Sequence, residues 1–476
     1  MIRIKLLTIL LLLFMSEVVS ANSLTLEQFL TQIVNNHPFF KKETIKPDIL
    51  KTQQQALLGD EDWYVNATTR LAHEESGIND AFTAEKTNNA NLDVSLNRAY
   101  WLTGGQVSLA YSLARSSQDF SQGKIKSYQN NVSLQYVHPL LKNVNGILSQ
   151  LNYQLQNYSI QNSELNMLEA KENFLADLSD KYLDWVLQTE LRRINEERLA
   201  ISQTELTRSQ KKRANNLVPK VDVIRAKTAY IQSKQSLHQT QTTLSSILAE
   251  LAVITQDNKF ASLTPSYALY KTNPLPDENQ VQTHIENQSR LLNIYQIRLD
   301  QIRHNLRGLS NAKKPDLNFI VGAGLLGNDD KLGGSTSIDK PQYSVALSFN
   351  YPLANRSAKA NIDQAHLQKM QIEEEKNDLT LQLQSSAAAI VEQLAQLEIS
   401  LTLHQEQIES YKTKTSEELK RYNQGRSELT FVLQSQDQEQ QAKIAYAITA
   451  TTYHKVYLRY RALMDELLKS IDEGGA

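Results

Sequence analysis

The residue types that could act in catalysis or bind a cofactor do not have the spacing of a known catalytic or cofactor-binding motif. The segment Gly322-Ala-Gly-Leu-Leu-Gly327 has the G-x-G-x-x-G spacing that binds a dinucleotide when a helix follows. A polar loop sequence, Asn328–Ser335, follows instead, so we attribute the glycines to a crowded strand and expect no cofactor. The nine histidines lack ligand spacing, and no Ser-His-Asp set or carboxylate pair is indicated. We expect no metal site and no enzymatic activity.

The start of the chain and its composition indicate an exported protein. Residues 1–21 have the features of a secretory signal peptide: Arg3 and Lys5, an apolar core at Leu6–Met15 and a small-residue cleavage site ending at Ala21. The remainder carries 50 − 2 = 48 basic and 52 − 1 = 51 acidic residues, which argues against a nucleic-acid partner. The sequence has no cysteine, so neither a disulfide framework nor a lipid-modified cysteine is expected. No later segment has the uninterrupted apolar run of a membrane helix, so any membrane insertion would use strands.

A strand-like segment occurs twice. Val132–Leu140 and Val345–Leu353 share Val, Leu, aromatic, Pro and Leu in one register. Each alternates apolar and polar side chains and ends at a proline, which cannot donate a ladder hydrogen bond. The duplication predicts two tandem structural repeats, 22–276 and 277–476.

Long helices follow both copies. Ile147–Val218 and Leu353–Gln424 are equally long, and neither contains Gly or Pro. An unbroken helix of that length measures about 100 Å, and apolar residues at 3-4 spacing predict coiled-coil packing. We expect helices at 147–216 and 355–424, tips at 215–220 and 423–427, and return helices at 221–254 and 428–469.

The remaining segments are expected to complete both repeats. Two short N-terminal helices, at about 24–36 and 51–58, precede strands at about 63–139. The polar segments Ser76–Asn91 and 116–131 are expected to be loops. A connector at 255–276, a helix at 278–306 and strands at about 317–351 follow. The aromatic residues Trp63, Tyr64, Tyr100, Trp101 and Tyr351 are expected along one edge of the strands, as in an interfacial girdle.

The order of these elements resembles the TolC-like outer-membrane efflux duct family. The resemblance spans nearly all of the mature chain and rests on short motifs in a specific order. They are Leu24-Thr-Leu-Glu-Gln28 with Asn36-His-Pro38, both Pro-Leu strand ends, Leu217-Val218 with Asp222-Val223, and Tyr422 with Gly425 and Val432-Leu433.

The resemblance implies a homotrimer in the outer membrane with a large periplasmic part. Three chains would close one β-barrel, continued by an α-helical coiled-coil barrel. The implied function is the exit duct of a tripartite efflux or type I secretion system, joined to an inner-membrane transporter by a periplasmic adaptor. Whether the hairpin at 92–115 also spans the membrane decides between four and six barrel strands per chain, and the sequence does not decide it. Nor does the sequence distinguish among drug, metal and protein as the cargo. The alternative is an exported coiled-coil structural or adhesive protein with a small β head.

The resemblance also assigns candidate site residues near the two tips. Aspartate rings often close the duct in this family, and alignment through Gly425 places Phe431 and Gln434 at those positions, whereas Asp222 matches the first tip. The candidate constriction comprises Asp222, Glu428, Phe431 and Gln434. The candidate adaptor-docking residues are Lys211, Lys212, Arg213, Asn216, Leu217, Val218, Lys220, Gly425 and Arg426. The basic run at 211–213 fits either docking or a solvated face.

Overall fold

The computed structural model describes residues 23–77 and 82–474, so the predicted signal peptide lies outside the described residues. The chain divides into two compact units. The helical unit contains the described residues up to Ile45, Leu165–Asn293 and the residues from Asn377 onward. The sheet unit contains Lys46–Glu164 and Ile294–Lys376.

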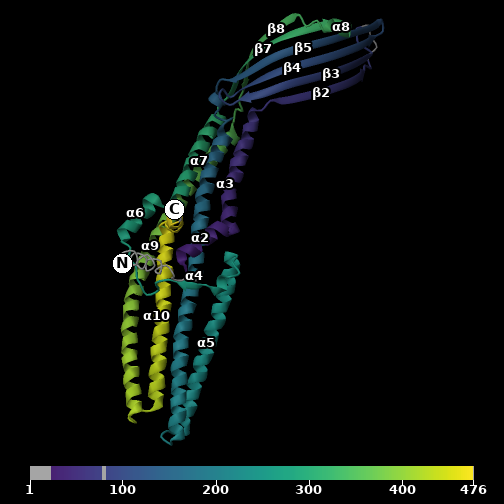
Figure 1. The fold of residues 1–476 in the computed structure, drawn as a ribbon. Helices are drawn as coiled ribbons and strands as arrows, with labels where there is room; N and C mark the ends of the chain where they lie inside the picture. The colour runs from purple at the N-terminus through teal and green to yellow at the C-terminus, as the bar shows by residue number, and fades with distance from the viewer. Residues whose placement is uncertain (1–22, 78–81, 475–476) are drawn as a thin grey trace, which may run out of the picture. The chain divides into compact units, whose positions relative to one another are not determined.

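The sheet unit is built on six antiparallel strands in the order β2-β3-β4-β5-β7-β8 (Figure 1). The strands are β2 (Tyr64–Glu75), β3 (Lys86–Tyr100), β4 (Gly105–Phe120), β5 (Gly123–Pro139), β7 (Asp316–Asp329) and β8 (Lys340–Asn350). The hairpin at 92–115 therefore belongs to the sheet, between β2 and β5. Short helix α8 (Leu332–Ser335) lies in the connection between β7 and β8.

Two segments expected to be loops are strands in the structure. Lys86–Asn91 begins β3, and most of 116–131 extends β4 and β5. These segments carry few apolar side chains, but a ladder is held by backbone hydrogen bonds, which need no hydrophobic alternation. The glycines at 322–327 lie inside β7, where a Cβ added at Gly324 would approach the Val132 carbonyl oxygen to 2.9 Å. That crowding agrees with the predicted role of these glycines.

The strand register gathers apolar side chains on one face of the sheet. Leu92 lies opposite Leu113, and Val132 lies opposite Leu325, whereas the alternate positions pair polar or small residues such as Ser108. This apolar face is exposed in the single chain. Its most exposed large side chains are Val65, Leu71, Leu134, Tyr343, Val345, Leu347 and Phe349.

The aromatic residues expected along one edge divide into two groups. Four of them, Trp63, Tyr64, Tyr100 and Tyr351, lie at one end of the strands, at the start of β2, the end of β3 and just after β8. Trp63 and Tyr64 are exposed. Trp101 follows β3 but is only 8% exposed and packs edge-on against Tyr153, with ring centroids 5.7 Å apart. Trp101 is therefore a packing residue.

The observed helices differ in detail from the expected set. They are α2 (Leu26–Asn36), α3 (Pro38–Leu57), α4 (Leu151–Ala214), α5 (Lys220–Thr255), α6 (Glu278–Gln288), α7 (Arg290–Ala312), α9 (Arg356–Asn423), α10 (Leu429–Leu463) and α11 (Leu467–Gly474). Helix α3 begins at Pro38 because proline is tolerated where the first helical N–H groups have no partner. The predicted helix at 278–306 is interrupted at Ser289, and that at 428–469 is interrupted near Asp465, whose φ is 58°. Among the described residues, no helix is both long and apolar enough to cross a membrane.

The core of the helical unit lies among α2, α4, α5, α9 and α10. Its largest fully buried side chains include Trp185, Tyr182 and Phe29, and the Tyr182 hydroxyl donates to the Leu24 carbonyl at 2.7 Å. Strands β1 (Ser23–Thr25) and β6 (Thr264–Ser266) pair in parallel beside this core. These contacts join the start of the described chain to the connector after α5.

Candidate functional site at the helical tips

Both long helices end in the same backbone turn. At the first tip, the Leu217 N–H donates to the Lys212 carbonyl at 2.9 Å, and Asn216 is left-handed with φ 58°. At the second tip, the Arg426 N–H donates to the Arg421 carbonyl at 2.9 Å, and Gly425 has φ 73°. This is a Schellman arrangement, in which a left-handed residue satisfies the last helical carbonyls. Asn216 and Gly425 are residue types that tolerate this conformation.

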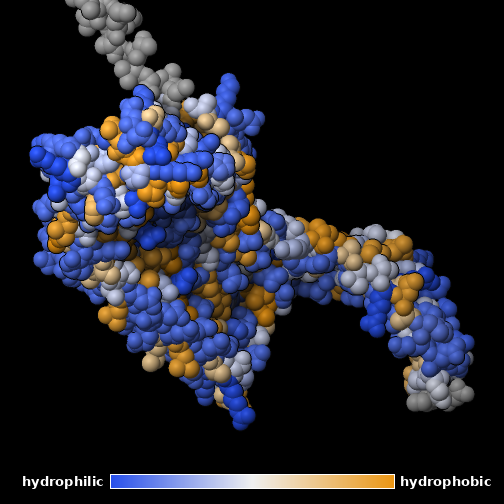
Figure 2. All heavy atoms as spheres, turned by 90° about the horizontal axis from the view of Figure 1, so that it is seen from below, coloured by the Kyte–Doolittle hydropathy of each residue, from blue (hydrophilic) through white to orange (hydrophobic). Residues whose placement is uncertain are grey.

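The two tips pack on each other within the helical unit, and they lie side by side in Figure 1. Leu429 and Val432 of α10 are fully buried against Ala226 of α5, Leu206 of α4 and Tyr422 of α9. Seen from below, hydrophilic residues cover most of the helical ends, with hydrophobic residues in interrupted streaks among them (Figure 2). A small apolar cluster therefore fixes the tips beneath a largely polar surface.

The predicted docking residues are mostly, but not all, exposed. Lys211, Arg213 and Lys220 are exposed, and Leu217 is 71% exposed. Lys212 is half-buried, with its Nζ 3.9 Å from the centre of the Tyr422 ring. The remaining docking candidates are the exposed Asn216, Gly425 and Arg426 and the half-buried Val218.

Lys212 differs chemically from its neighbours in the basic run. Burial lowers its pKa, and the nearby Arg208 guanidinium lowers the pKa further. Burial also raises the pKa of Tyr422, on whose ring the Lys212 ammonium rests. Lys212 is thus a contact between the first tip and the second, which the sequence pattern of three consecutive basic residues did not indicate.

The four constriction candidates fall into two environments. Glu428, Phe431 and Gln434 lie at every third position at the start of α10 and are all exposed, with Phe431 at 52%. They flank buried Val432, so α10 presents one face to the tip core and the other to solvent. Asp222 lies in the first turn of α5, is only 8% exposed, and pairs with Arg225 at 3.2 Å.

Farther from the tips, polar contacts tie α4 to α10. Arg198 is 4% exposed and donates to Asp437 at 2.5 Å and to Gln436 at 3.2 Å. Asn195 accepts from Gln440 at 2.7 Å and donates to Thr240 of α5 at 2.9 Å. Buried polar side chains of this kind hold two helices in one register because every alternative leaves a group unpaired.

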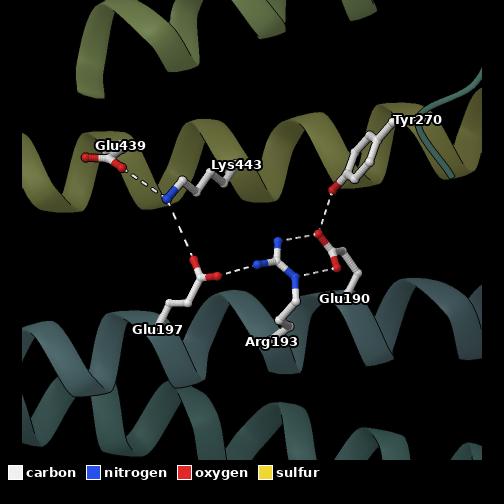
Figure 3. Close-up of polar contacts among 6 residues, drawn as sticks. All are labelled: Glu190, Arg193, Glu197, Tyr270, Glu439 and Lys443. Carbon is white, nitrogen blue, oxygen red and sulfur yellow. Dashed lines mark hydrogen bonds and ion pairs between the residues drawn. The ribbon is translucent and has the colours of Figure 1, made fainter. Parts of the chain in front are cut away.

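A second network lies along the same helices (Figure 3). Arg193 of α4 donates to both carboxylate oxygens of Glu190, at 2.7 and 2.8 Å, and also contacts Glu197. Lys443 of α10 reaches Glu197 at 3.8 Å, which extends the network across the helix pair.

The network ends on the connector after α5, where the Tyr270 hydroxyl donates to Glu190 at 2.8 Å. Burial acts to raise the pKa of Glu190, but the hydrogen bonds from Arg193 and Tyr270 outweigh it and the pKa is lowered. Sequence reasoning missed both networks, although Glu190, Arg193 and Glu197 have the 3-4 spacing of helical ion pairs.

The fold is that of solved outer-membrane channels. MtrE of Neisseria gonorrhoeae, in its open state, is 14% identical with a TM-score of 0.63, over 93% of this chain and 89% of that one. CmeC of Campylobacter jejuni is 12% identical with a TM-score of 0.65, over 92% and 85%. VceC of Vibrio cholerae is 10% identical with a TM-score of 0.67, over 93% and 96%. This likeness confirms, at the level of fold, the resemblance found in the sequence.

No protein-family model matches the sequence, and no curated protein matches it. The similarity is therefore one of structure. The channels compared are outer-membrane proteins, which agrees with the location expected from the sequence.

Proposed function

We propose that this chain is the outer-membrane exit duct of a tripartite efflux or type I secretion system. It would passively conduct substrate that an inner-membrane transporter delivers through a periplasmic adaptor. The observation that carries the proposal is the exposed apolar face of the six-stranded sheet. An apolar face of this extent needs an apolar partner to cover it. Membrane lipid can cover it once the backbone groups of both edge strands are hydrogen-bonded.

Trimer formation would close those edges. Strands β2 and β8 are the ends of the sheet order, so each offers an unpaired ladder to another copy. Three chains would give 3 × 6 = 18 strands, an even number within the range of outer-membrane barrels. The repeats 22–276 and 277–476 would each supply one long helical hairpin per chain to the periplasmic barrel. The polar face of the sheet would then line the lumen.

The exposed face of α10 is the better candidate for the constriction. Glu428, Phe431 and Gln434 are free to face an axis, whereas the Asp222 carboxylate is already paired with Arg225. Symmetry would bring three copies of Phe431 together, and an apolar ring closes a pore by packing and by excluding water. A neck of this kind would bind multivalent cations weakly.

The exposed basic side chains of the first tip would dock the adaptor. Lys211 and Lys220 suit a charge-reversal test because neither takes part in the Tyr422 contact made by Lys212. Lys211→Glu with Lys220→Glu should abolish export at unchanged trimer yield. Lys234→Glu with Lys412→Glu is the control, because it makes the same change of charge at exposed positions outside the candidate docking residues. Export that survives the double reversal would assign the basic run to solvation alone.

Membrane fractionation and mass measurement test the proposal as a whole. The full chain should appear in the outer-membrane fraction, need detergent for extraction, and have the mass of a trimer in detergent. A stable detergent-solubilised monomer would refute the duct. Release from cells without detergent would support the alternative of an exported coiled-coil adhesin.

A further inference from the structure

A cavity of about 580 Å³ lies in the sheet unit, where strands give way to helices. Its walls come from the turn before α4 and the first residues of α4, from the end of α7, and from α9 at His366. The turn before α4 is fixed by Asn143, whose N–H donates to the side chain of Asn311 at 2.8 Å. Asn311 is 4% exposed, so the end of α7 is held firmly against this turn.

The charge of the lining is one-sided. Arg307, Lys314, His304 and His366 line the cavity, and none of its lining residues is a carboxylate. Arg307 and Lys314 are exposed, and the ion pairs of the described residues include neither of them. Arg303, one turn earlier on α7, instead pairs with Asp300 at 2.6 Å. Two unpaired cations beside a hollow favour an anionic ligand.

The cavity also has apolar and amide walls. Leu151, Leu306 and Ile147 contribute apolar surface, and Ile147 is 44% exposed. Gln150 also lines the cavity; one N–H of its amide donates to the Trp101 carbonyl at 3.1 Å, which leaves the second N–H for an anion. Leu151 lies so close to Gly308 that a Cβ there would collide with its side chain, so glycine lets α7 approach α4. The volume lies in the ordinary range for small-ligand sites.

We propose that this cavity binds the phosphate of an anionic phospholipid headgroup. The assignment rests on the proposed function, which places this end of the strands at the periplasmic leaflet of the outer membrane. Arg307 and Lys314 would neutralise the phosphate, and the exposed side chains of Leu140, Leu141 and Ile147 would contact the glycerol and acyl chains. Because the lining offers no carboxylate to an ammonium group, an anionic headgroup should be preferred over a zwitterionic one.

Native mass spectrometry of the full chain, purified in detergent, tests the site. The protein is titrated with dioleoylphosphatidylglycerol, with dioleoylphosphatidylethanolamine and, separately, with inorganic phosphate as a competitor. We expect phosphatidylglycerol to bind at least about tenfold more tightly than phosphatidylethanolamine, and millimolar phosphate not to displace it. Arg307→Gln with Lys314→Gln should weaken phosphatidylglycerol binding about twenty-fivefold, since each cation near a lipid surface contributes about fivefold.

The matched control removes equal charge from the same stretch of chain. Arg303→Gln with Lys313→Gln should leave the preference for phosphatidylglycerol unchanged. Equal losses in both double variants would refute a defined site in favour of general surface charge. Displacement by free phosphate would refute a lipid site in favour of a soluble anion. If the chain fractionates with the outer membrane but shows no lipid preference, this inference fails and the proposed function does not. Absence from the outer membrane refutes the proposed function instead.

Discussion

The two helical tips share a backbone and differ in chemistry. Each reverses the chain through a left-handed residue, Asn216 or Gly425, with equivalent carbonyl contacts. The helix that follows the first tip begins with a buried, paired Asp222, whereas the helix after the second begins with the exposed Phe431. The turn geometry thus constrains a single position, which must hold a residue that tolerates a left-handed backbone. The side chains on the next turn are free to serve a gate or a docking surface.

The largest effect should come from separating the tips. Leu429 is fully buried at the centre of the cluster that joins them, so Leu429→Ala should destabilise this region by about 3 kcal/mol through lost packing and a cavity. Hydrogen exchange at the α5 and α10 amides measures the change. Leu217→Ala is the control, because a side chain that is 71% exposed should contribute less than about 0.5 kcal/mol. Equal effects would show that the cluster does not hold the tips together.

The second prediction concerns substitutions of Phe431 on the exposed face of α10. Phe431→Ala should raise the resting conductance of the trimer in a planar bilayer, because the apolar ring would be smaller. Phe431→Asp should create block by multivalent cations added on the tip side, lowering the half-blocking concentration at least about tenfold. Thr430→Ala is the control, because Thr430 is an exposed α10 residue outside the constriction candidates. Strong cation block of the unmodified protein would instead assign the ring to Asp222 or Glu428.

The third prediction concerns substitutions of the two left-handed residues, Gly425 and Asn216. Gly425→Ala should cost about 1 kcal/mol from backbone strain alone, since a Cβ added there meets no atom within 4 Å. Asn216→Gly should change stability by less than about 0.5 kcal/mol, because both residue types tolerate the conformation. Thermal unfolding of the detergent-solubilised protein compares them. If Gly425→Ala leaves the melting temperature unchanged, the second tip adopts another turn.

The sequence predicted the two long helices and the turn residues at their tips because each has a local cause. A segment as long as Ile147–Val218 that contains neither Gly nor Pro cannot easily be anything but helical, and Asn216 and Gly425 mark where the long helices end. The sequence did not predict strands at Lys86–Asn91, since backbone pairing rather than side-chain pattern holds them. It also grouped Lys212 with its basic neighbours, because the Tyr422 ring that covers it comes from α9, in the second repeat.

The smallest predicted effect concerns that lysine and the pH. The pKa of Lys212 is lowered from its ordinary value of 10.5 by burial and by Arg208. Below the folded-state pKa both states are protonated, and the cost of burying the ammonium is constant. Between the folded-state pKa and 10.5 the folded protein releases the proton while the unfolded chain keeps it, so the free energy of unfolding rises with pH. Lys212→Met retains the packing on Tyr422 and removes this titration.

The gain in melting temperature between pH 8 and pH 10, measured by circular dichroism, should therefore be smaller in Lys212→Met than in the parent protein. Lys211→Met, which removes an exposed ammonium one residue earlier, should keep the parent slope. Burial raises the pKa of Tyr422 above its ordinary value of 10, so its phenol stays largely protonated in the folded protein over this pH range. Identical slopes in the two variants would mean that Lys212 is as solvated as its neighbour. The two tips would then be joined by the apolar cluster alone.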